Sequence, residues 1–462
     1  MTLELLTARQ KPAARSIPIH VVDRLAWPTR RKALPAMQRQ WLETVEFDAR
    51  PDSYALMPGP DGTLAEVWAG VRAEDDPFAL AALPKALPEG SYHLAGGGLA
   101  LTDDAAALSW KLGGYVFDLY RRRRRPAAVL QMRASEAAAR GSLIAEAMMA
   151  VRDLVNTPAE HMGPAELAEA ARLLARQQGA TFRQIVGDKL LASGFPAIHA
   201  VGRAANRAPR LIELNWGNPK HPKLALVGKG VCFDSGGLDI KGADGMRLMK
   251  KDMGGAANTL GLAMLVMALK LPVRLQVLIP AVENAIAGNA YRPGDVIRTR
   301  AGIHIEIGNT DAEGRVILCD ALALAGEGKP ALIIDMATLT GAARVALGPQ
   351  LPALFCRDTS AARDLVDRGL AMGDPMWHMP LWQPYHANIE SDIADIVNTG
   401  RNGMAGAVTA ALFLADFVPD NIPWMHIDLF AWNDSARPGR PPGGEAQTIR
   451  ALLAMLEDRF GR

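Results

Sequence analysis

From about residue 160 onward, short apolar runs alternate with stretches of helical spacing. Four mostly apolar runs are typical of buried strands: Lys223–Gly228, Arg274–Asn284, Ala331–Thr338 and Pro423–Leu429. Four other stretches carry the pattern of helices: Pro164–Gln177, Gly254–Leu269, Val316–Ala325 and Ala407–Phe417. This alternation predicts an α/β domain with a central, mostly parallel mixed sheet that is covered by helices.

The first part of the chain has a different texture. Up to about residue 130, short apolar runs are broken by scattered proline and glycine, and a run of five arginines follows at Arg121–Arg125. A helical pattern then extends from about Ala134 to Leu154 and ends where prolines and a glycine interrupt it. We therefore predict a smaller N-terminal α/β domain over residues 1–135, a linking helix over 136–160 and a larger α/β domain over 161–462.

Composition and charge limit the function classes. Hydrophobic residues make up 49% of the 462 and charged residues 22%, which is typical of a soluble globular protein, and the net charge of +2 gives no general attraction to nucleic acid. The cysteines are odd in number and widely spaced, which argues against a disulfide framework and fits a reducing compartment. Neither a secretory signal nor an apolar run of roughly 18 residues is present. We expect a cytoplasmic protein with no membrane partner.

Two polar clusters follow predicted strands, where ligands of α/β sheets usually bind. The first comes after KLALVG and contains Lys229, Asp234, Lys241 and Asp252; the second is NTDAEGR, Asn309–Arg315. Neither cluster contains histidine, so the HExxH type of zinc site is excluded. The remaining carboxylate-rich set suits Mg²⁺, Mn²⁺ or Zn²⁺.

Spacing within the second cluster favours a joint role for its charged residues. In an extended backbone, Asp311, Glu313 and Arg315 would share one face, and the predicted helix would begin directly after them. A helix N-terminus favours anions, and two carboxylates forced together there favour a cation between them. Taken alone, the triplet is more simply a solvated turn, and FDSGG a turn with a capping aspartate. The metal-site interpretation depends on all the pieces occurring together.

Taken together, the motifs resemble the cytosol (leucyl) aminopeptidases, a family of two-metal exopeptidases. NTDAEGR is close to the signature of that family, and VGKGVCFDSGGLDIK, KKDMGGAAN, PGDVI and DMATLTGAA occur in the family's order. The resemblance runs from about Val151 to the C-terminus and is faint over the first 130 residues, as expected for the family's variable N-terminal domain.

The resemblance implies a ligand set and two catalytic residues. Two divalent ions would be bound, Mn²⁺ or Zn²⁺, with Mg²⁺ also compatible. Their ligands would be Lys229, Asp234, Asp252, Asp311 and Glu313. Asp234 and Glu313 would bridge the two ions. Lys241 is similar to the cationic group that stabilises the oxyanion, and Arg315 to the residue that holds a bicarbonate ion as general base. Asp239 and Gly242 depart from the family's usual residues and flank Lys241.

The resemblance also implies substrate and assembly. The pocket for the first side chain would include Met249, Thr338, Leu339 and Gly341, which favours leucine or a broad apolar preference. The substrates would be peptides with a free N-terminus, and the chain would assemble as a homohexamer.

Two alternatives differ in class. A dinuclear phosphoesterase would use similar carboxylates but generally adds His or Asn ligands and a phosphate-binding helix, neither of which is evident in these motifs. DNA binding, known in some bacterial members of the family, has direct support only from Arg121–Arg125, and the near-neutral net charge favours a solvated loop there.

Overall fold

The computed structural model describes residues 16–121 and 128–461, which form two compact units. One unit holds the described residues up to Met149 together with Asp434–Pro442, and the other holds Ala150–Asn433 and the described residues from Gly443 onward. The division falls within the long helix α5 (Glu136–Asn156). The predicted class, two α/β domains with a mostly parallel mixed sheet in the larger one, is confirmed. The exact domain bounds 1–135, 136–160 and 161–462 stay a prediction.

The N-terminal unit is built on a five-stranded sheet in the order β2-β3-β1-β4-β5. Its strands are β1 (Ser16–Asp23), β2 (Tyr54–Pro58), β3 (Leu64–Val71), β4 (Ser91–Leu94) and β5 (Val129–Gln131). Only the β2–β3 pair is antiparallel among the described strands of this sheet. Its helices are α1 (Trp27–Lys32), α2 (Ala36–Thr44), α3 (Leu83–Ala86) and α4 (Asp103–Gly114). Of the arginine run Arg121–Arg125, all but Arg121 lie outside the described residues.

The larger unit contains a nine-stranded mixed sheet in the order β15-β14-β17-β13-β8-β10-β7-β6, with β9 paired to β10. The central strands β17 (Trp424–Asp428), β13 (Leu332–Ala337), β8 (Lys223–Gly228), β10 (Arg274–Asn284) and β9 (Gly230–Asp234) are parallel to their neighbours within this group. Antiparallel pairs join β7 (Arg210–Trp216) to β10, β6 (Thr181–Val186) to β7 and β14 (Ala353–Cys356) to β17. β15 (Trp377–His378) completes the sheet.

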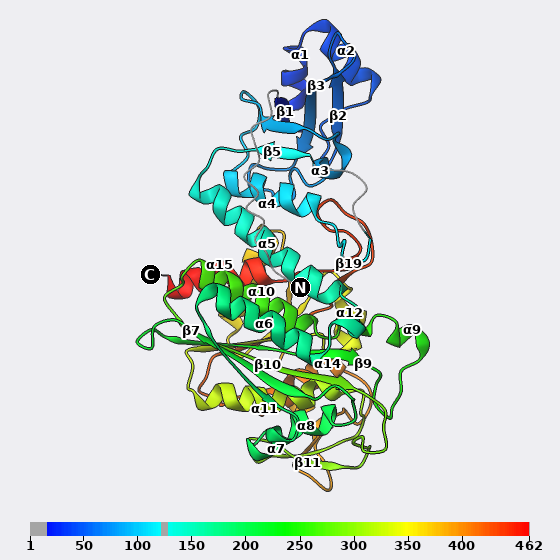
Figure 1. The fold of residues 1–462 in the computed structure, drawn as a ribbon, viewed down its shortest axis with the longest axis vertical. Helices are drawn as coiled ribbons and strands as arrows, with labels where there is room; N and C mark the ends of the chain where they lie inside the picture. Colours follow the sequence, from blue (N-terminus) through cyan, green and yellow to red (C-terminus); the bar gives the residue numbers. More distant parts are fainter. Residues whose placement is uncertain (1–15, 122–127, 462) are drawn as a thin grey trace. The chain divides into compact units, whose positions relative to one another are not determined.

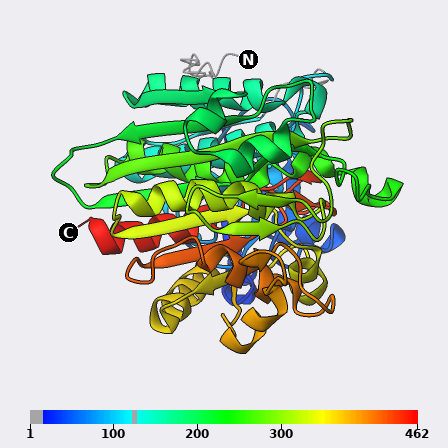
Figure 2. The same cartoon turned by 90° about the horizontal axis from the view of Figure 1, so that it is seen from below.

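Helices cover both faces of this sheet. Figure 1 shows α6 (Pro164–Gln178) and α10 (Gly254–Ala268) on one face, with α8 (Pro196–Gly202) and α11 (Glu313–Glu327) on the other, and Figure 2 gives a second view of the layers. Helix α10 is apolar on nearly all sides, and almost all of its residues are buried, as expected for a helix inside a large core.

The remaining elements complete the larger unit. The helices are η1 (Ala159–His161), α7 (Lys189–Ala192), α9 (Ala243–Met246), η2 (Met249–Lys251), α12 (Gly341–Leu347), α13 (Thr359–Ala371), η3 (Gln383–Ile389), α14 (Gly406–Ala415) and α15 (Ile449–Phe460). Two small sheets contain β11 (Val296–Arg298), β12 (His304–Glu306) and β16 (Ile396–Val397), and β18 (Trp432–Asn433) and β19 (Gly443–Gly444).

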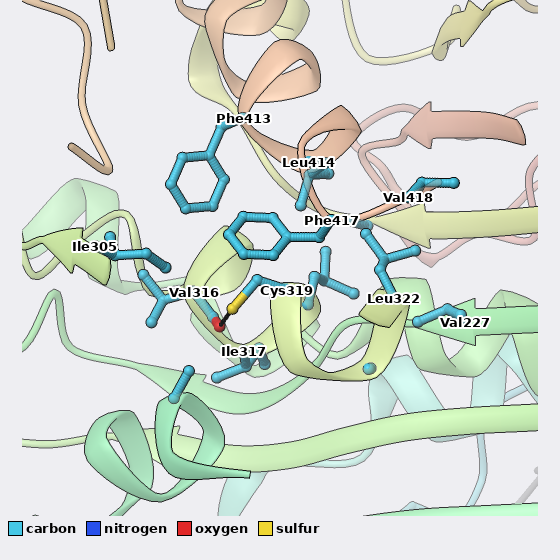
Figure 3. Close-up of a cluster of buried hydrophobic side chains, with 14 of the residues drawn as sticks. Val227, Ile305, Val316, Ile317, Cys319, Leu322, Phe413, Leu414, Phe417 and Val418 are labelled. Carbon is cyan, nitrogen blue, oxygen red and sulfur yellow. Dashed lines mark hydrogen bonds between the residues drawn. The ribbon is translucent and has the colours of Figure 1, made fainter. Parts of the chain in front are cut away.

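The helix that carries the second polar cluster is held by a buried apolar core. Figure 3 shows Val316 and Leu322 of α11 packed toward Phe413 of α14 and toward Phe417, whose ring centroid lies 5.4 Å from that of Phe413. The thiol of Cys319 is buried in the same cluster and donates to the carbonyl of Val316 at 2.8 Å. This packing fixes the first turn of α11, from which two of the predicted site residues project.

All four predicted strands and four predicted helices of the larger unit are present, with shifts of a few residues at their ends. The largest shift is in α11, which begins at Glu313 rather than at Val316. Among the described residues, no helix has both the length and the apolar character needed to span a membrane.

Candidate metal centre

The carboxyl ends of neighbouring parallel strands bring the predicted site residues together. Lys229 directly follows β8, Asp234 ends β9 and Asn284 ends β10. Asp252 lies between η2 and α10, and Glu313 is the first residue of α11. Segments that are far apart in the chain therefore meet at one edge of the sheet, as α/β sheets arrange their ligand sites.

Three buried carboxylates form the core of the centre. Asp234, Asp252 and Glu313 each place one oxygen within 4.8 Å of the others. The Lys229 ammonium lies 2.7 Å from Oδ2 of Asp252 and 2.8 Å from Oε1 of Glu313, and it also donates to the carbonyl of Thr338 at 2.8 Å. A buried lysine thus balances part of the negative charge.

A second lysine extends the centre toward the surface. The Lys241 ammonium lies 2.9 Å from Oδ2 of Asp234 and forms an ion pair with Oδ1 of Asp311. Because Asp234 belongs to both groups, all five predicted ligands and Lys241 form one continuous cluster.

The donor set fits divalent metal ions. Oδ2 of Asp252, Oδ1 of Asp311 and Oε1 of Glu313 are buried and make no hydrogen bond within the described residues, although each is at ion-pair distance from a lysine. Four carboxylates this close together with only two lysines between them favour further cations, and hard cations bind carboxylate oxygens. These residues are therefore suited to divalent ions of the Mn²⁺ or Mg²⁺ type.

The electrostatics of the cluster are those of a site that concentrates negative charge. Burial and the charge of Asp234 raise the pKa of Asp311 to about 6, and burial followed by Asp234 also raises the pKa of Glu313 well above its usual range. Burial alone would lower the pKa of Lys229, but Asp252, Glu313 and Asp234 outweigh it and raise that pKa. A ligand role for Lys229 requires loss of this proton, which nearby dications favour because they reverse the local field.

Residues that the sequence analysis did not single out hold the ligands in place. The Asn284 side-chain amide donates to Oδ1 of Asp234 at 2.9 Å and to the carbonyl of Thr310 at 3.0 Å. The Tyr291 hydroxyl donates to the same carbonyl at 2.6 Å. The only sequence signal for Asn284 was its place at the end of a predicted strand, and Tyr291 had none.

The loop of Lys241 is tied to the turn of Asp311. The Thr310 amide donates to the Asp239 carboxylate at 2.7 Å, and the Asp239 amide donates to the Thr310 hydroxyl at 2.8 Å. Gly237 has φ +67°, and a Cβ there would lie 2.9 Å from the Thr310 hydroxyl oxygen, so FDSGG requires glycine at this point. Asp239, one of the departures from the family, therefore has a structural role.

The expectation that Asp311, Glu313 and Arg315 share one extended face is wrong. Because α11 begins at Glu313, that residue and Arg315 point about 200° apart on a helix. Glu313 faces Lys229, whereas Arg315 donates to the carbonyl of Asn398 at 2.8 Å. Burial lowers the pKa of Arg315 to about 10, so it stays cationic at neutral pH, and its buried Nε has no hydrogen-bond partner among the described residues.

The predicted pocket residues lie on segments next to the ligands. Met249 begins η2, three positions before Asp252, and its carbonyl accepts from the Asp252 amide at 3.2 Å. The Thr338 hydroxyl donates to the Asp252 carboxylate at 2.9 Å, so Thr338 also supports a ligand. Leu339 is partly buried after β13, and Gly341 is exposed at the start of α12.

Comparisons with known proteins identify the family. Residues 149–453 match the cytosol aminopeptidase family, catalytic domain, and residues 17–133 match the M17 aminopeptidase N-terminal domain. A probable cytosol aminopeptidase of Roseiflexus castenholzii is 44% identical over 70% of this chain and 67% of its own length. A probable cytosol aminopeptidase of Syntrophotalea carbinolica is 46% identical over 66% of this chain and 62% of its own length. The match therefore covers less than two thirds of that relative.

Solved structures agree with these matches. The cytosol aminopeptidase of Coxiella burnetii is 48% identical, with a TM-score of 0.92, and the match covers 97% of this chain and 98% of that one. The bottromycin maturation enzyme BotP in complex with Mn is 33% identical, with a TM-score of 0.87, and covers 96% of this chain and 100% of its own. The chain belongs to the cytosol aminopeptidase family, whose members are metallo-aminopeptidases.

Proposed function

We propose that the chain removes N-terminal amino acids from peptides in intracellular peptide turnover, using two divalent ions held by Lys229, Asp234, Asp252, Asp311 and Glu313. The observation that carries this proposal is the buried cluster of Asp234, Asp252 and Glu313, whose oxygens lie within 4.8 Å of one another. The manganese complex of BotP supports Mn²⁺ as one occupant, and Zn²⁺ or Mg²⁺ would suit the same oxygens. Such ions supply Lewis acidity toward the scissile carbonyl and a water nucleophile.

Lys241 is proposed to stabilise negative charge that develops on the carbonyl oxygen. Burial would lower its pKa, but Asp234 and Asp311 raise that pKa above the usual range, so the ammonium stays protonated. The hydrogen bonds between Asp239 and Thr310 fix the loop that carries it. A donor that is held in place before the reaction needs little reorganisation when charge develops.

Arg315 is proposed to hold a bicarbonate ion, which would supply a general base at the centre. Its guanidinium is buried, Nη1 is committed to Asn398, and Nε has no partner among the described residues. Among the described residues, Arg315 forms no ion pair with Asp311 or Glu313, so its charge is available to a small anion. Planar guanidinium groups suit planar oxyanions of this kind.

We propose that the first side chain of the substrate packs against Met249, Thr338, Leu339 and Gly341, with leucine and other apolar residues accepted. The partly buried positions of Met249 and Leu339 beside the ligand segments support this assignment. A flexible methionine fits side chains of several shapes.

The proposal is tested with leucine p-nitroanilide and protein from which metal has been removed by a chelator. Hydrolysis should be absent in the chelated protein and should return when Mn²⁺ is added in excess. Cleavage of p-nitrophenyl phosphate in the same preparation would instead favour a phosphoesterase. Hydrolysis of the anilide that is insensitive to the chelator would refute the metal-dependent function.

Assembly and location are proposals of the same kind. A homohexamer in the cytoplasm is what the family resemblance implies, and the exposed side chains of Trp377, Trp382 and Ile393 would suit subunit contacts. Native mass spectrometry would distinguish a hexamer from a monomer. DNA binding has little support, because its only sequence signal is the run Arg121–Arg125 and the net charge of the chain is +2.

A further inference from the structure

Among the described residues, one buried lysine next to the centre forms no ion pair and no hydrogen bond. Lys251 is 4% exposed, and its ammonium makes no hydrogen bond or ion pair within the described part of the chain. Its contact is with the ring of Phe430, whose centroid lies 4.5 Å from Nζ. Asp252 and Asp428 favour the charged form of Lys251 without forming an ion pair with it, and a buried charge without a directly paired anion is costly, so this position suggests a ligand that brings one.

A second cation lies on the same ring. The Arg344 guanidinium on α12 is 5.0 Å from the centroid of Phe430 and likewise forms no ion pair or hydrogen bond among the described residues. Phe430 is partly exposed, so an aromatic surface and two cationic groups occur together. Cation–π contacts hold these groups in place but do not neutralise them.

The carboxylates nearest in the chain are already committed. Asp428 accepts from the Leu339 amide at 3.0 Å and from the Thr340 hydroxyl at 2.6 Å. Asp252 accepts from the Thr338 hydroxyl and faces Lys229. Neither acid therefore serves as a hydrogen-bonded partner for Lys251 or Arg344.

These two cations border the proposed pocket for the first side chain. Lys251 lies two positions after Met249, and Nη2 of Arg344 is 3.8 Å from the point that a Cβ on Gly341 would occupy. Ala431, next to Phe430 in the chain, lies close to Gly254. A Cβ added to Gly254 would lie 2.3 Å from the Cβ of Ala431 and 3.0 Å from Cγ2 of Thr338. The ring and its cations are thus joined to the pocket wall.

We propose that the pocket also accepts acidic N-terminal residues, with the carboxylate of a glutamyl side chain bound by Lys251 and Arg344 and its methylene groups packed on Phe430. Leucine would use only the apolar part, whereas glutamate would use both parts. This inference rests on the proposed aminopeptidase function, because it names a substrate class for that site.

Glutamyl and glutaminyl p-nitroanilides test the inference, because they have nearly the same size and differ in charge. With the Mn²⁺-loaded protein, kcat/KM for the glutamyl substrate should exceed that for the glutaminyl one by roughly 10- to 100-fold, as expected for charge-assisted hydrogen bonds. Arg344→Met and Lys251→Met should each bring this ratio close to 1. Lys220→Met, which removes a lysine from an exposed turn, should keep the wild-type ratio.

A ratio near 1 in the wild type, or a wild-type ratio in both pocket variants, would overturn the inference. Arg344→Met should fold and bind metal like the wild type, because Arg344 is exposed and contacts no proposed ligand. A changed ratio in this variant therefore cannot come from a folding or metal-loading defect. Calorimetric titration of L-glutamate and L-glutamine onto the Mn²⁺-loaded protein is the second readout. If no anilide is cleaved, the proposed function fails, and the titration tests the acidic pocket by itself. Tighter binding of glutamate than of glutamine would then support the pocket, and equal binding would refute it.

Discussion

At the scale of single residues, the charge balance of the centre depends on two lysines and four acids. Lys229 and Lys241 each contact two of the carboxylates, which leaves the cluster with an excess of two negative charges when all of its groups are ionised. Divalent ions would neutralise this excess, which becomes three negative charges when Lys229 changes from counter-ion to neutral ligand as they bind.

Glu313→Gln tests the residue that faces Lys229 and belongs to the three buried carboxylates of the centre. Glutamine keeps the shape but lacks the second anionic oxygen, so turnover of leucine p-nitroanilide should fall by more than the ~10–100-fold typical of residues that only support a ligand. Circular dichroism should show a folded variant. The exposed Glu390→Gln serves as the control and should behave like the wild type. Near-normal turnover in Glu313→Gln would remove Glu313 from the centre.

Asn284→Ala tests a supporting residue. The change deletes the amide that donates to Asp234 and to the Thr310 carbonyl, so Mn²⁺ affinity should weaken by roughly 10–100-fold while saturating Mn²⁺ restores part of the activity. Activity measured against free Mn²⁺ concentration gives the shift. Asn289→Ala, at an exposed loop amide that donates to the Arg203 carbonyl, is the matched control. Superimposable Mn²⁺ curves for Asn284→Ala and wild type would contradict the role.

At the scale of elements, a buried acid connects α8 with α11. Oδ2 of Asp320, on α11, accepts from the amides of Ala197 and Ile198 in the first turn of α8, at 2.9 and 3.3 Å. Its other oxygen accepts from the Arg300 amide at 2.8 Å. Burial nevertheless dominates and raises the pKa of Asp320 to about 6.

This pKa predicts a direction for stability. Because the folded state holds the proton more tightly than the unfolded chain, the contribution of Asp320 to the free energy of unfolding falls as pH rises from about 4 to about 6, by roughly 2–3 kcal/mol. Asp320→Asn lacks this titration. Urea unfolding of both proteins between pH 4 and pH 7 should show the variant gaining stability relative to wild type across that window. A pH-independent difference would contradict the assigned pKa.

Burial decides which helices and strands could be predicted from the sequence. The strands β8, β10, β13 and β17 are buried on both faces and therefore appear as apolar runs. The start of α11 was missed because Asp-x-Glu-x-Arg fits an extended strand as well as a helical first turn, and the packing of Val316 against α14 decides between them. The N-terminal strands were not delineated, because partly exposed strands such as β5 leave a weak pattern.

Site residues that stand in long motifs could be predicted from the sequence, whereas isolated ones could not. Lys229, Asp234 and Glu313 stand in motifs that the family shares, and the structure brings them together. Asn284 and Lys251 were missed since an amide at a strand end, or a second lysine before an acid, is ordinary on a protein surface. Their burial depends on contacts from distant segments, which spacing does not reveal.

At the scale of the whole molecule, metal binding should stabilise the fold. Ions that bind only the folded state add free energy of unfolding, about 2.7 kcal/mol at a hundredfold excess over Kd. Mn²⁺ should therefore raise the Tm of chelator-treated protein by several degrees, and Glu313→Gln should show a smaller rise. Differential scanning calorimetry measures both. An unchanged Tm in wild-type protein at saturating Mn²⁺ would argue against a preformed metal centre.

One carboxylate cluster is proposed to hold two divalent ions in each chain. Elemental analysis by mass spectrometry, after Mn²⁺ loading and exhaustive dialysis, tests it most directly. We predict close to two equivalents of metal per chain in the wild type and fewer in folded Glu313→Gln. Substoichiometric metal in the wild type, or the same content in both proteins, would contradict a two-metal centre built on these residues.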